Sequence, residues 1–374
     1  MRRIVLGMMV PLLLSGGPVF RFLGWWGLGA YWILGAVACA FAVRLWREFP
    51  PDKWLSRRSA RIGIILILLL YAAAFSIVYP IADSGRIGGG SDRDDALNLA
   101  TSRLFAGEYP YAEPTHLGKP ISPLPGGLIL SALWVLGLGN AAWQNLLWLL
   151  VLFLLMARIT RSEPAALCIF IFLTMGSVAL QHELMTGGDL LANSIAVTTV
   201  AVVAGLGGRW SRGWRMAVLA VFAGLALAWR ANFFFVLPLL VVRMGRTTGW
   251  REASVFTGVC LLTSAAVIVP VWMWDPEHFT PIHGYYEIGY LDAAFPCFGK
   301  LVVGAMAVVS LGLAAAGNSE RWLRHAALVQ ILPIAAAGLA VGIRCPWCAL
   351  TFLQFGLMPL FLWVGDLAVA KKLS

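Results

Sequence analysis

The sequence predicts an all-α integral membrane protein that crosses the bilayer many times. Of its 374 residues, 60% are hydrophobic and only 12% are charged. Apolar runs such as 64–71 and 146–156 are typical of membrane helices, and such runs suffice for roughly ten to twelve membrane segments. Barrel strands would alternate apolar and polar residues, which these runs do not do. We find no soluble domain or internal repeat, so residues 1–374 are expected to form a single transmembrane domain.

The distribution of charge predicts the partner and the orientation of the chain. The formal net charge is +10, which in a soluble protein would suggest nucleic-acid binding. Here the basic residues lie in short loops between apolar runs, which is the pattern of cytoplasmic loops. We therefore exclude nucleic acid as a partner, expect membrane lipids instead, and place the chain in the cell (plasma) membrane.

The first elements are two apolar runs, 4–20 and 25–43. The first run lacks a small-residue cleavage site, so we expect an uncleaved span and not a signal peptide. The basic loop 44–61 should be cytoplasmic, and run 62–81 should then cross outward. It leads to an external hydrophilic loop, 82–122, whose length of about forty residues is unusual for a connection.

A short amphipathic helix is predicted within this loop, over 96–105. Its apolar residues recur at helical spacing on one face, so we expect it to lie along the outer membrane surface. Ser91 followed by Asp94 resembles a capping box at its start, and Gly107 is a helix-ending residue. Tyr111, just beyond, is expected to anchor this segment at the membrane interface.

A proline-rich segment, 120–127, then leads back into the membrane. Two apolar runs follow, 128–138 and 142–156. We expect one of the two to be partial or re-entrant, because two full crossings would place Arg158 and Arg161 on the external side.

The remaining apolar runs should alternate in direction, with basic loops inside and acidic loops outside. Run 216–242 is broken by Arg230 and Asn232, which fits a hairpin whose tip reaches the external side. The other predicted crossings are 164–180, 190–206, 255–274, 301–316, 322–341 and 350–369.

Two cysteines near the end, Cys345 and Cys348, have the spacing of a redox motif without a thioredoxin-like βαβ pattern around them. Two interpretations stay open. They are bystander thiols at a helix start, or they form a disulfide, with Cys297 as a further candidate partner, if both loops face an oxidising compartment.

The acidic cluster Asp92, Asp94 and Asp95 is the first candidate for chemistry. Carboxylates this close repel one another, so at least one pKa should rise unless a cation such as Arg93 intervenes. A carboxylate poised in this way can act as general base towards a hydroxyl nucleophile. The competing interpretation is purely structural, since aspartate is favourable near any helix N-terminus.

The order of these features resembles the GT-C superfamily of membrane glycosyltransferases, most closely its mannosyltransferase-like branch. The resemblance consists of an acid-containing first external loop, a surface helix, Gly-x-x-Pro-Tyr at 107–111 and the proline-rich segment from 120 to 125. It covers the first half of the chain and extends to the rest only as topology. Ala96 stands where the family has an aromatic residue, which leaves the register open by one turn.

The resemblance implies a GT-C-like fold and inverting transfer of a sugar at the extracytoplasmic face of the membrane. The sugar would pass from a polyprenyl-phosphate-linked donor to a hydroxyl of a glycan or a lipid-linked acceptor. Asp92 is then the expected catalytic base, with Asp95 in reserve. Arg230 is expected to bind the donor phosphate, and Lys119 and Arg344 are further candidates for that role.

Arg230 interrupts an apolar run, where a charge is costly and usually functional, although an interfacial arginine with a snorkelling head would also fit. The remaining polar residues of the external segments are expected to bind substrate. These candidates are Asp94, Tyr111, His116, His182, Glu183, Asp189 and Asn232.

No metal site is predicted and no cofactor is required. His182 and Glu183 lack the second histidine of a zinc helix. Asp92 and Asp94 do form a loose D-x-D, which some superfamily members use around a divalent metal ion, so such an ion stays compatible.

The main competing hypothesis is a membrane transporter or lipid flippase with an external acidic binding loop. Transporter sites tend to lie near the bilayer midplane, whereas these acids lie in a surface loop. A scaffold without chemistry would explain the apolar composition but not the acidic cluster.

Overall fold

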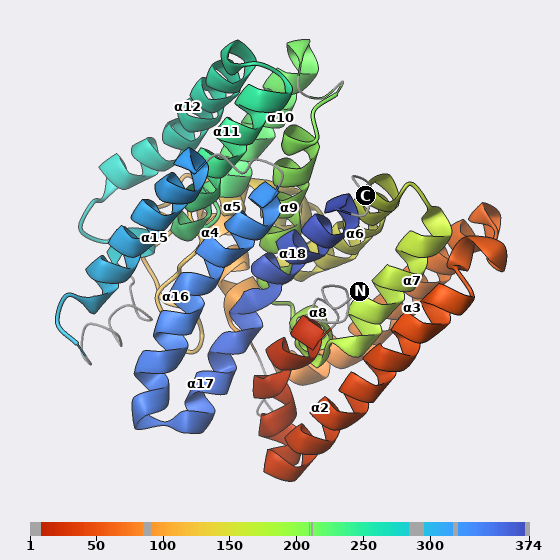
Figure 1. The fold of residues 1–374 in the computed structure, drawn as a ribbon. Helices are drawn as coiled ribbons and strands as arrows, with labels where there is room; N and C mark the ends of the chain where they lie inside the picture. The colour runs from red at the N-terminus through yellow and green to blue at the C-terminus, as the bar shows by residue number, and fades with distance from the viewer. Residues whose placement is uncertain are drawn as a thin grey trace.

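The structure is built from helices throughout the part of the chain that it describes (Figure 1). Many of these helices are rich in leucine, isoleucine, valine and alanine. A helix satisfies its backbone hydrogen bonds within one segment, as lipid requires. The computed structural model describes residues 9–84, 91–208, 210, 212–283, 295–316 and 321–370, without the side chains of residues 47, 282, 283, 344, 346 and 367–370.

Seven helical segments of these described ranges are long and apolar enough to cross a membrane, which indicates a multi-pass membrane protein. A bent pair of helices would make eight. The seven are Gly16–Trp46 in α2 (Gly16–Glu48), Arg57–Asp83 (α3), Ala141–Thr160 (η2, Ala141–Trp143, with α6, Gln144–Thr160), Trp250–Trp274 (α12), Phe298–Ala315 (α15), Trp322–Ile343 in α16 (Trp322–Arg344) and Trp347–Asp366, which runs from α17 (Pro346–Phe352) into α18 (Leu357–Ala370).

This number of full-length spans is smaller than the predicted ten to twelve segments. Three of the apolar runs form helices of only 14 to 16 residues, α5 (Pro125–Leu138), α9 (Leu190–Gly205) and α10 (Gly213–Leu227). The predicted crossing 164–180 is not a single straight helix. It divides into α7 (Glu163–Gly176) and α8 (Val178–Met185), which are bent by 79° about Ser177.

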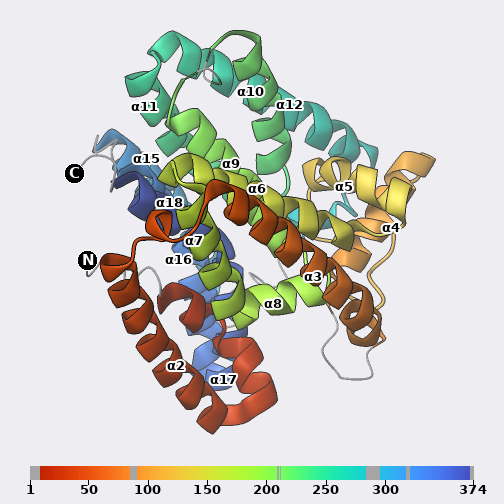
Figure 2. The same cartoon turned by 90° about the vertical axis from the view of Figure 1, so that its right-hand side faces the viewer.

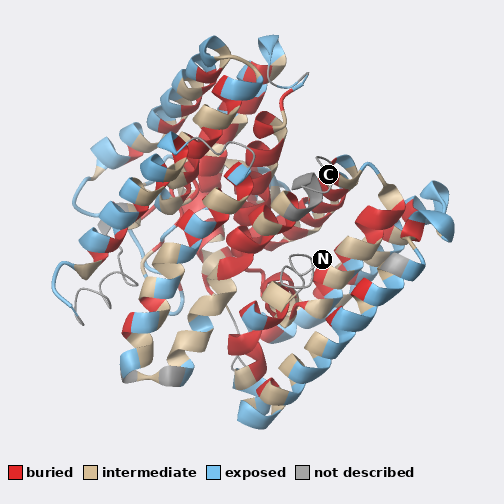
Figure 3. Ribbon diagram, viewed as in Figure 1, coloured by how far each residue is buried: buried red, intermediate tan, exposed pale blue. Residues whose placement is uncertain are grey.

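The centre of the protein is α9, whose residues are nearly all buried (Figure 3). Its many alanines, valines and threonines offer small surfaces on every side, so neighbouring helices pack all around it. The peripheral helices are different, because α3 exposes Ile65, Leu66 and Leu69 by more than half of their surface. Such exposed aliphatic side chains suit a lipid-facing surface.

Of the two runs after the proline-rich segment, 128–138 forms the shorter helix, α5, whereas 142–156 belongs to the segment of η2 and α6, which is long enough to span. The predicted break at Arg230 is also present. There, α10 ends at Leu227, and the 3₁₀ helix η4 (Ala231–Val236) precedes α11 (Leu237–Thr247).

The helix predicted over 96–105 is present as α4 (Arg93–Ala106), and Gly107 ends it with a φ of 77°. The predicted capping box is wrong, because the N-cap position is held by Asp92 and not by Ser91. The apolar face of α4 packs on α5, with Leu97 fully buried. Tyr111 is likewise buried and donates a hydrogen bond to the Pro123 carbonyl at 2.9 Å, so it is no membrane-interface anchor.

At one end of the molecule, α2 and α17 lie side by side (Figure 2). The approach is close because Gly17 has no side chain, and a Cβ there would lie 2.7 Å from the Leu350 carbonyl oxygen. Cys345, at the N-cap of α17, forms a disulfide with Cys348 inside that helix, whereas Cys297 is a free thiol.

Candidate functional site

Several of the predicted site residues line one cavity of about 830 Å³. Its walls come from α2, the start of α4, the 115–123 segment, α8, Arg230 and the α16–α17 connection. One wall is polar, with Arg21, Asp92, Arg93, Lys119, His182 and Arg230. Another part of the lining, here called the aromatic wall, is apolar and includes Phe20, Val341, Trp347, Phe352 and Phe355.

A second cavity, of about 700 Å³, contains none of the predicted site residues. It lies near the end of α6 and the start of α10 and is lined by Arg158, Trp210, Trp214 and Arg215. We therefore take the first cavity as the candidate functional site.

Asp92 is the only carboxylate that lines the candidate cavity among the described residues. Although Asp92 occupies the N-cap position of α4, its side chain makes no capping hydrogen bond. Its carboxylate instead accepts a hydrogen bond from Thr115 Oγ1 at 2.8 Å and lies 3.6 Å from Lys119 Nζ. Helix capping therefore does not account for this aspartate, and its carboxylate is held at the cavity wall by the 115–119 turn.

The carboxylate of Asp94 points to a different neighbour. The hydroxyl of Tyr79 donates a short hydrogen bond to it, and Asn140 Nδ2 donates to the same hydroxyl at 2.6 Å. Burial raises the pKa of Asp94 to about 7, because the charged form is poorly solvated there. The second oxygen, Oδ1, has no hydrogen-bond partner among the described residues.

Asp95 points away from the cavity and is about one-third exposed. Its carboxylate accepts a hydrogen bond from the His116 backbone at 3.0 Å and lies 3.1 Å from His116 Nδ1. Successive helical residues are about 100° apart around the axis, so the three neighbouring acids diverge. Burial, and not repulsion by Asp92 or Asp95, is the main cause of the raised pKa of Asp94. No group of three side chains that could hold a metal ion occurs in the described part of the chain.

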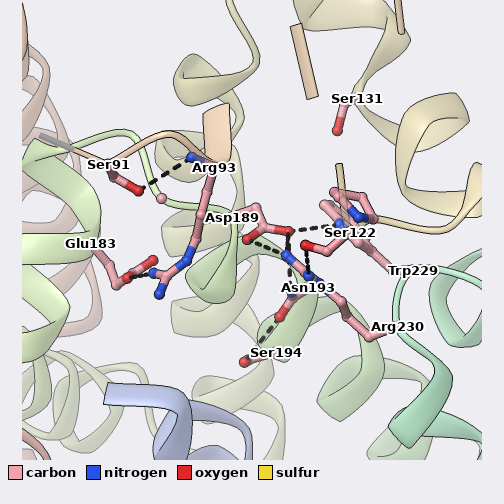
Figure 4. Close-up of polar contacts among 12 residues, drawn as sticks. Ser91, Arg93, Ser122, Ser131, Glu183, Asp189, Asn193, Ser194, Trp229 and Arg230 are labelled. Atoms are coloured by element: carbon pink, nitrogen blue, oxygen red, sulfur yellow. Dashed lines mark hydrogen bonds and ion pairs between the residues drawn. The ribbon is translucent and has the colours of Figure 1, made fainter. Parts of the chain in front are cut away.

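Arg230 is held in the polar wall by the predicted acid Asp189. Its Nη2 atom lies 2.9 and 2.7 Å from the two carboxylate oxygens, and Asp189 is itself buried. The indole of Trp229 donates to the same carboxylate at 3.2 Å, and Arg230 Nη1 donates to Ser122 Oγ at 2.6 Å (Figure 4). These bonds fix the guanidinium while about a fifth of its side chain stays exposed towards the cavity.

A second arginine, Arg93, is built into the same wall and was not among the predicted site residues. Its guanidinium forms an ion pair with Glu183, whose side chain is buried, and lies 5.0 Å from the centre of the Phe355 ring. The signal available in the sequence was Glu183 itself, because a carboxylate at the end of an apolar run needs a cation near it.

One short segment, 183–189, supplies both buried carboxylates. Glu183, at the start of the segment, forms an ion pair with Arg93, and Asp189, at its end, forms one with Arg230 (Figure 4). Gly188 is required between them, since a Cβ there would lie only 2.0 Å from Glu183 Oε2. Gly187 has a φ of 73°, a conformation that favours glycine.

The other predicted residues fall into three groups. Lys119 and His182 line the cavity, and the Nδ1 atom of His182 is buried without a hydrogen-bond partner among the described residues. Tyr111, His116 and Asn232 do not line it, and Asn232 instead bonds to Gln330 at 2.7 Å. Arg344 ends α16, but its side chain lies outside the described residues.

The charges suit an anion that carries an apolar chain. The lining has four cationic side chains and one carboxylate. When the buried carboxylates that pair with Arg93 and Arg230 are included, the formal net charge of the site is +1. Arginine guanidinium groups bind phosphate well because they donate two hydrogen bonds in one plane. The aromatic wall of the same cavity offers a surface for hydrocarbon.

Fold and site together define a helical, multi-pass membrane protein with a cavity lined by cationic and by apolar side chains. Comparisons with protein-family models, curated proteins and solved structures gave no match for this chain.

Proposed function

We propose that this protein is a membrane glycosyltransferase that moves a sugar from a polyprenyl-phosphate donor to an acceptor hydroxyl. The observation that carries the proposal is the joint presence in one cavity of a carboxylate, Asp92, two anchored arginines and an apolar wall. A phosphate, a sugar and a prenyl chain would each meet a chemically matching surface there.

The donor phosphate would bind to Arg230 and Arg93. Both guanidinium groups are oriented in advance by buried carboxylates, so little side-chain entropy is lost when a ligand binds. A sugar phosphodiester carries a single negative charge, which complements the net positive charge of the site. The prenyl chain would lie against the aromatic wall around Phe20 and Phe352.

Asp92 would act as the catalytic base. The acceptor oxygen attacks the anomeric carbon as its proton passes to Asp92, and the bond from that carbon to the phosphate oxygen breaks. The electron pair leaves with the lipid phosphate, whose growing charge the arginines stabilise. Attack from the side opposite the leaving group inverts the configuration at the anomeric carbon.

We place this reaction at the extracytoplasmic face of the cell membrane, with a glycan or a lipid-linked molecule as acceptor. The basic loop 44–61 supports that orientation by the positive-inside rule. The mechanism needs no metal ion, since the cations of the cavity neutralise the phosphate.

The proposal is tested by incubating purified protein in liposomes with a panel of radiolabelled polyprenyl-phosphate sugars and candidate acceptors. We expect one donor to lose its label to an acceptor and to release free polyprenyl phosphate. If the protein instead moves lipid between leaflets without forming product, it is a flippase, the alternative considered from the sequence. A protein that neither consumes nor binds any donor contradicts the proposal.

A further inference from the structure

The sequence motif that the proposed reaction does not use is Cys345-Pro-Trp-Cys348. The two cysteines form a disulfide, and both of them line the same cavity as Asp92. Trp347, between them, is about half exposed and lines the cavity as well. A disulfide that serves only packing has no need to face a cavity.

The backbone at this corner does not depend on the disulfide. The amide of Cys345 donates to the Val341 carbonyl at 2.9 Å, and the amide of Cys348 donates to the Cys345 carbonyl at 2.9 Å. The bond also closes a very short loop, and the stabilisation that a disulfide gives falls as the closed loop becomes shorter. Opening the disulfide should therefore leave the fold intact and only replace the disulfide in the cavity lining with two thiols.

The surroundings favour thiol chemistry. The thiolate is the form of cysteine that reacts, and nearby cations stabilise it. Arg93 lines the same cavity, and its guanidinium lies over the ring of Phe355, which follows Cys348 by seven residues and also lines the cavity. An external thiolate that enters the cavity would also be attracted by the net positive lining.

We propose that Cys345 and Cys348 form a redox-active site that opens and closes by exchange with an external dithiol. One thiolate of the dithiol attacks a sulfur of the pair and forms a mixed disulfide, and the other cysteine leaves as a thiolate. The second thiol of the dithiol then displaces the protein sulfur. The products are two cysteine thiols and the disulfide of the dithiol, so two electrons and two protons have passed to the protein.

The inference does not depend on sugar transfer, and it is tested by counting thiols. The full chain carries Cys297→Ser, which removes the exposed free cysteine. This protein is purified in detergent in its folded state and treated with dithiothreitol. Free thiols are then tagged with a polyethylene-glycol maleimide and counted by gel shift. Circular dichroism is recorded before and after reduction.

We expect two further adducts in the folded protein after reduction, one for each cysteine of the pair. A variant that also carries Cys345→Ser and Cys348→Ser should gain none. Adducts that form only after the protein is denatured would overturn the proposal, because the disulfide would then be inaccessible to an external dithiol.

A second measurement tests the place of the pair inside the cationic cavity. The reduced pair in the Cys297→Ser protein is modified with an anionic and with a cationic methanethiosulfonate. The ratio of the two rates is compared with that of Cys297 in a protein that carries only Cys345→Ser and Cys348→Ser. Cys297 is exposed and does not line the cavity, so it is the matched control. We expect the ratio to favour the anionic reagent by roughly tenfold over the control, because positively lined clefts concentrate anions. Equal ratios would contradict the assigned site.

Discussion

Replacing Asp189 with alanine should destabilise the protein strongly. The carboxylate is buried and binds Arg230 through two contacts of 2.9 and 2.7 Å, while Trp229 donates to it at 3.2 Å. Removal of one partner from a buried ion pair costs about 3–5 kcal/mol, because the other charge stays without compensation. A chain of this size loses roughly 2 °C of melting temperature per kcal/mol, so we expect a fall of roughly 6–10 °C.

The assay is thermal unfolding in detergent, followed by tryptophan fluorescence, with Glu48→Ala as the control. Glu48 pairs with Arg44 at 2.9 Å, but both side chains are at least half exposed. Such surface pairs contribute well under about 1 kcal/mol, so the control should melt within about 2 °C of the wild type. The double variant Asp189→Ala, Arg230→Leu should regain about half of the loss, since no unpaired charge is left.

The reasoning is refuted if Asp189→Ala melts like Glu48→Ala, or if the double variant is less stable than Asp189→Ala alone. Either result would mean that Arg230 is not held by a buried carboxylate.

The remaining predictions concern affinity, packing and pH. Arg93→Lys should weaken binding of labelled polyprenyl phosphate by roughly tenfold, because lysine offers no planar pair of donors; unchanged affinity would remove Arg93 from the site. Gly188→Ala should cost about 1–3 kcal/mol in thermal unfolding, since its Cβ would lie 2.0 Å from the carboxylate of Glu183. Gly137→Ala, where a Cβ meets nothing within 4 Å, is its control and should be neutral or slightly stabilising. The pKa of Asp94 is raised to about 7 in the folded state, so the native protein binds more protons than the unfolded chain between about pH 4 and pH 7. Its contribution to stability is therefore present below about pH 4 and is lost as the pH rises towards 7. Asp94→Asn should remove that part of the pH dependence, and a melting curve across pH that is identical in both proteins would contradict it.

The break at Arg230 could be predicted because a guanidinium and an amide inside an apolar run are costly in lipid. The end of α4 was equally predictable, since Gly107 adopts a φ of 77° that other residues avoid. Both signals are local, so they can be read from a few neighbouring residues.

The number of spans could not be predicted from hydropathy. A helix buried on all sides by other helices has the same composition as one that faces lipid, and α9 is such a helix. The length of a helix distinguishes a short buried helix from a membrane-spanning one, but that length is known only when the ends of the helix are known.

The site itself was predictable only in part. Residues of the predicted loop 82–122 do line the candidate cavity, but the directions of Asp92, Asp94 and Asp95 depend on where α4 begins. A shift by one residue rotates a side chain by about 100°. The ion pair of Arg93 with Glu183 joins residues 90 positions apart, so no spacing rule could have found it.

The most direct test of the account compares two aspartates of the same loop. Single-turnover transfer of labelled sugar from the accepted polyprenyl-phosphate donor is measured for Asp92→Asn and for Asp95→Asn, with melting temperature as the folding control. The account predicts that Asp92→Asn abolishes transfer in a folded protein, whereas Asp95→Asn keeps most of it, because only Asp92 lines the cavity. Full transfer by Asp92→Asn would contradict the account.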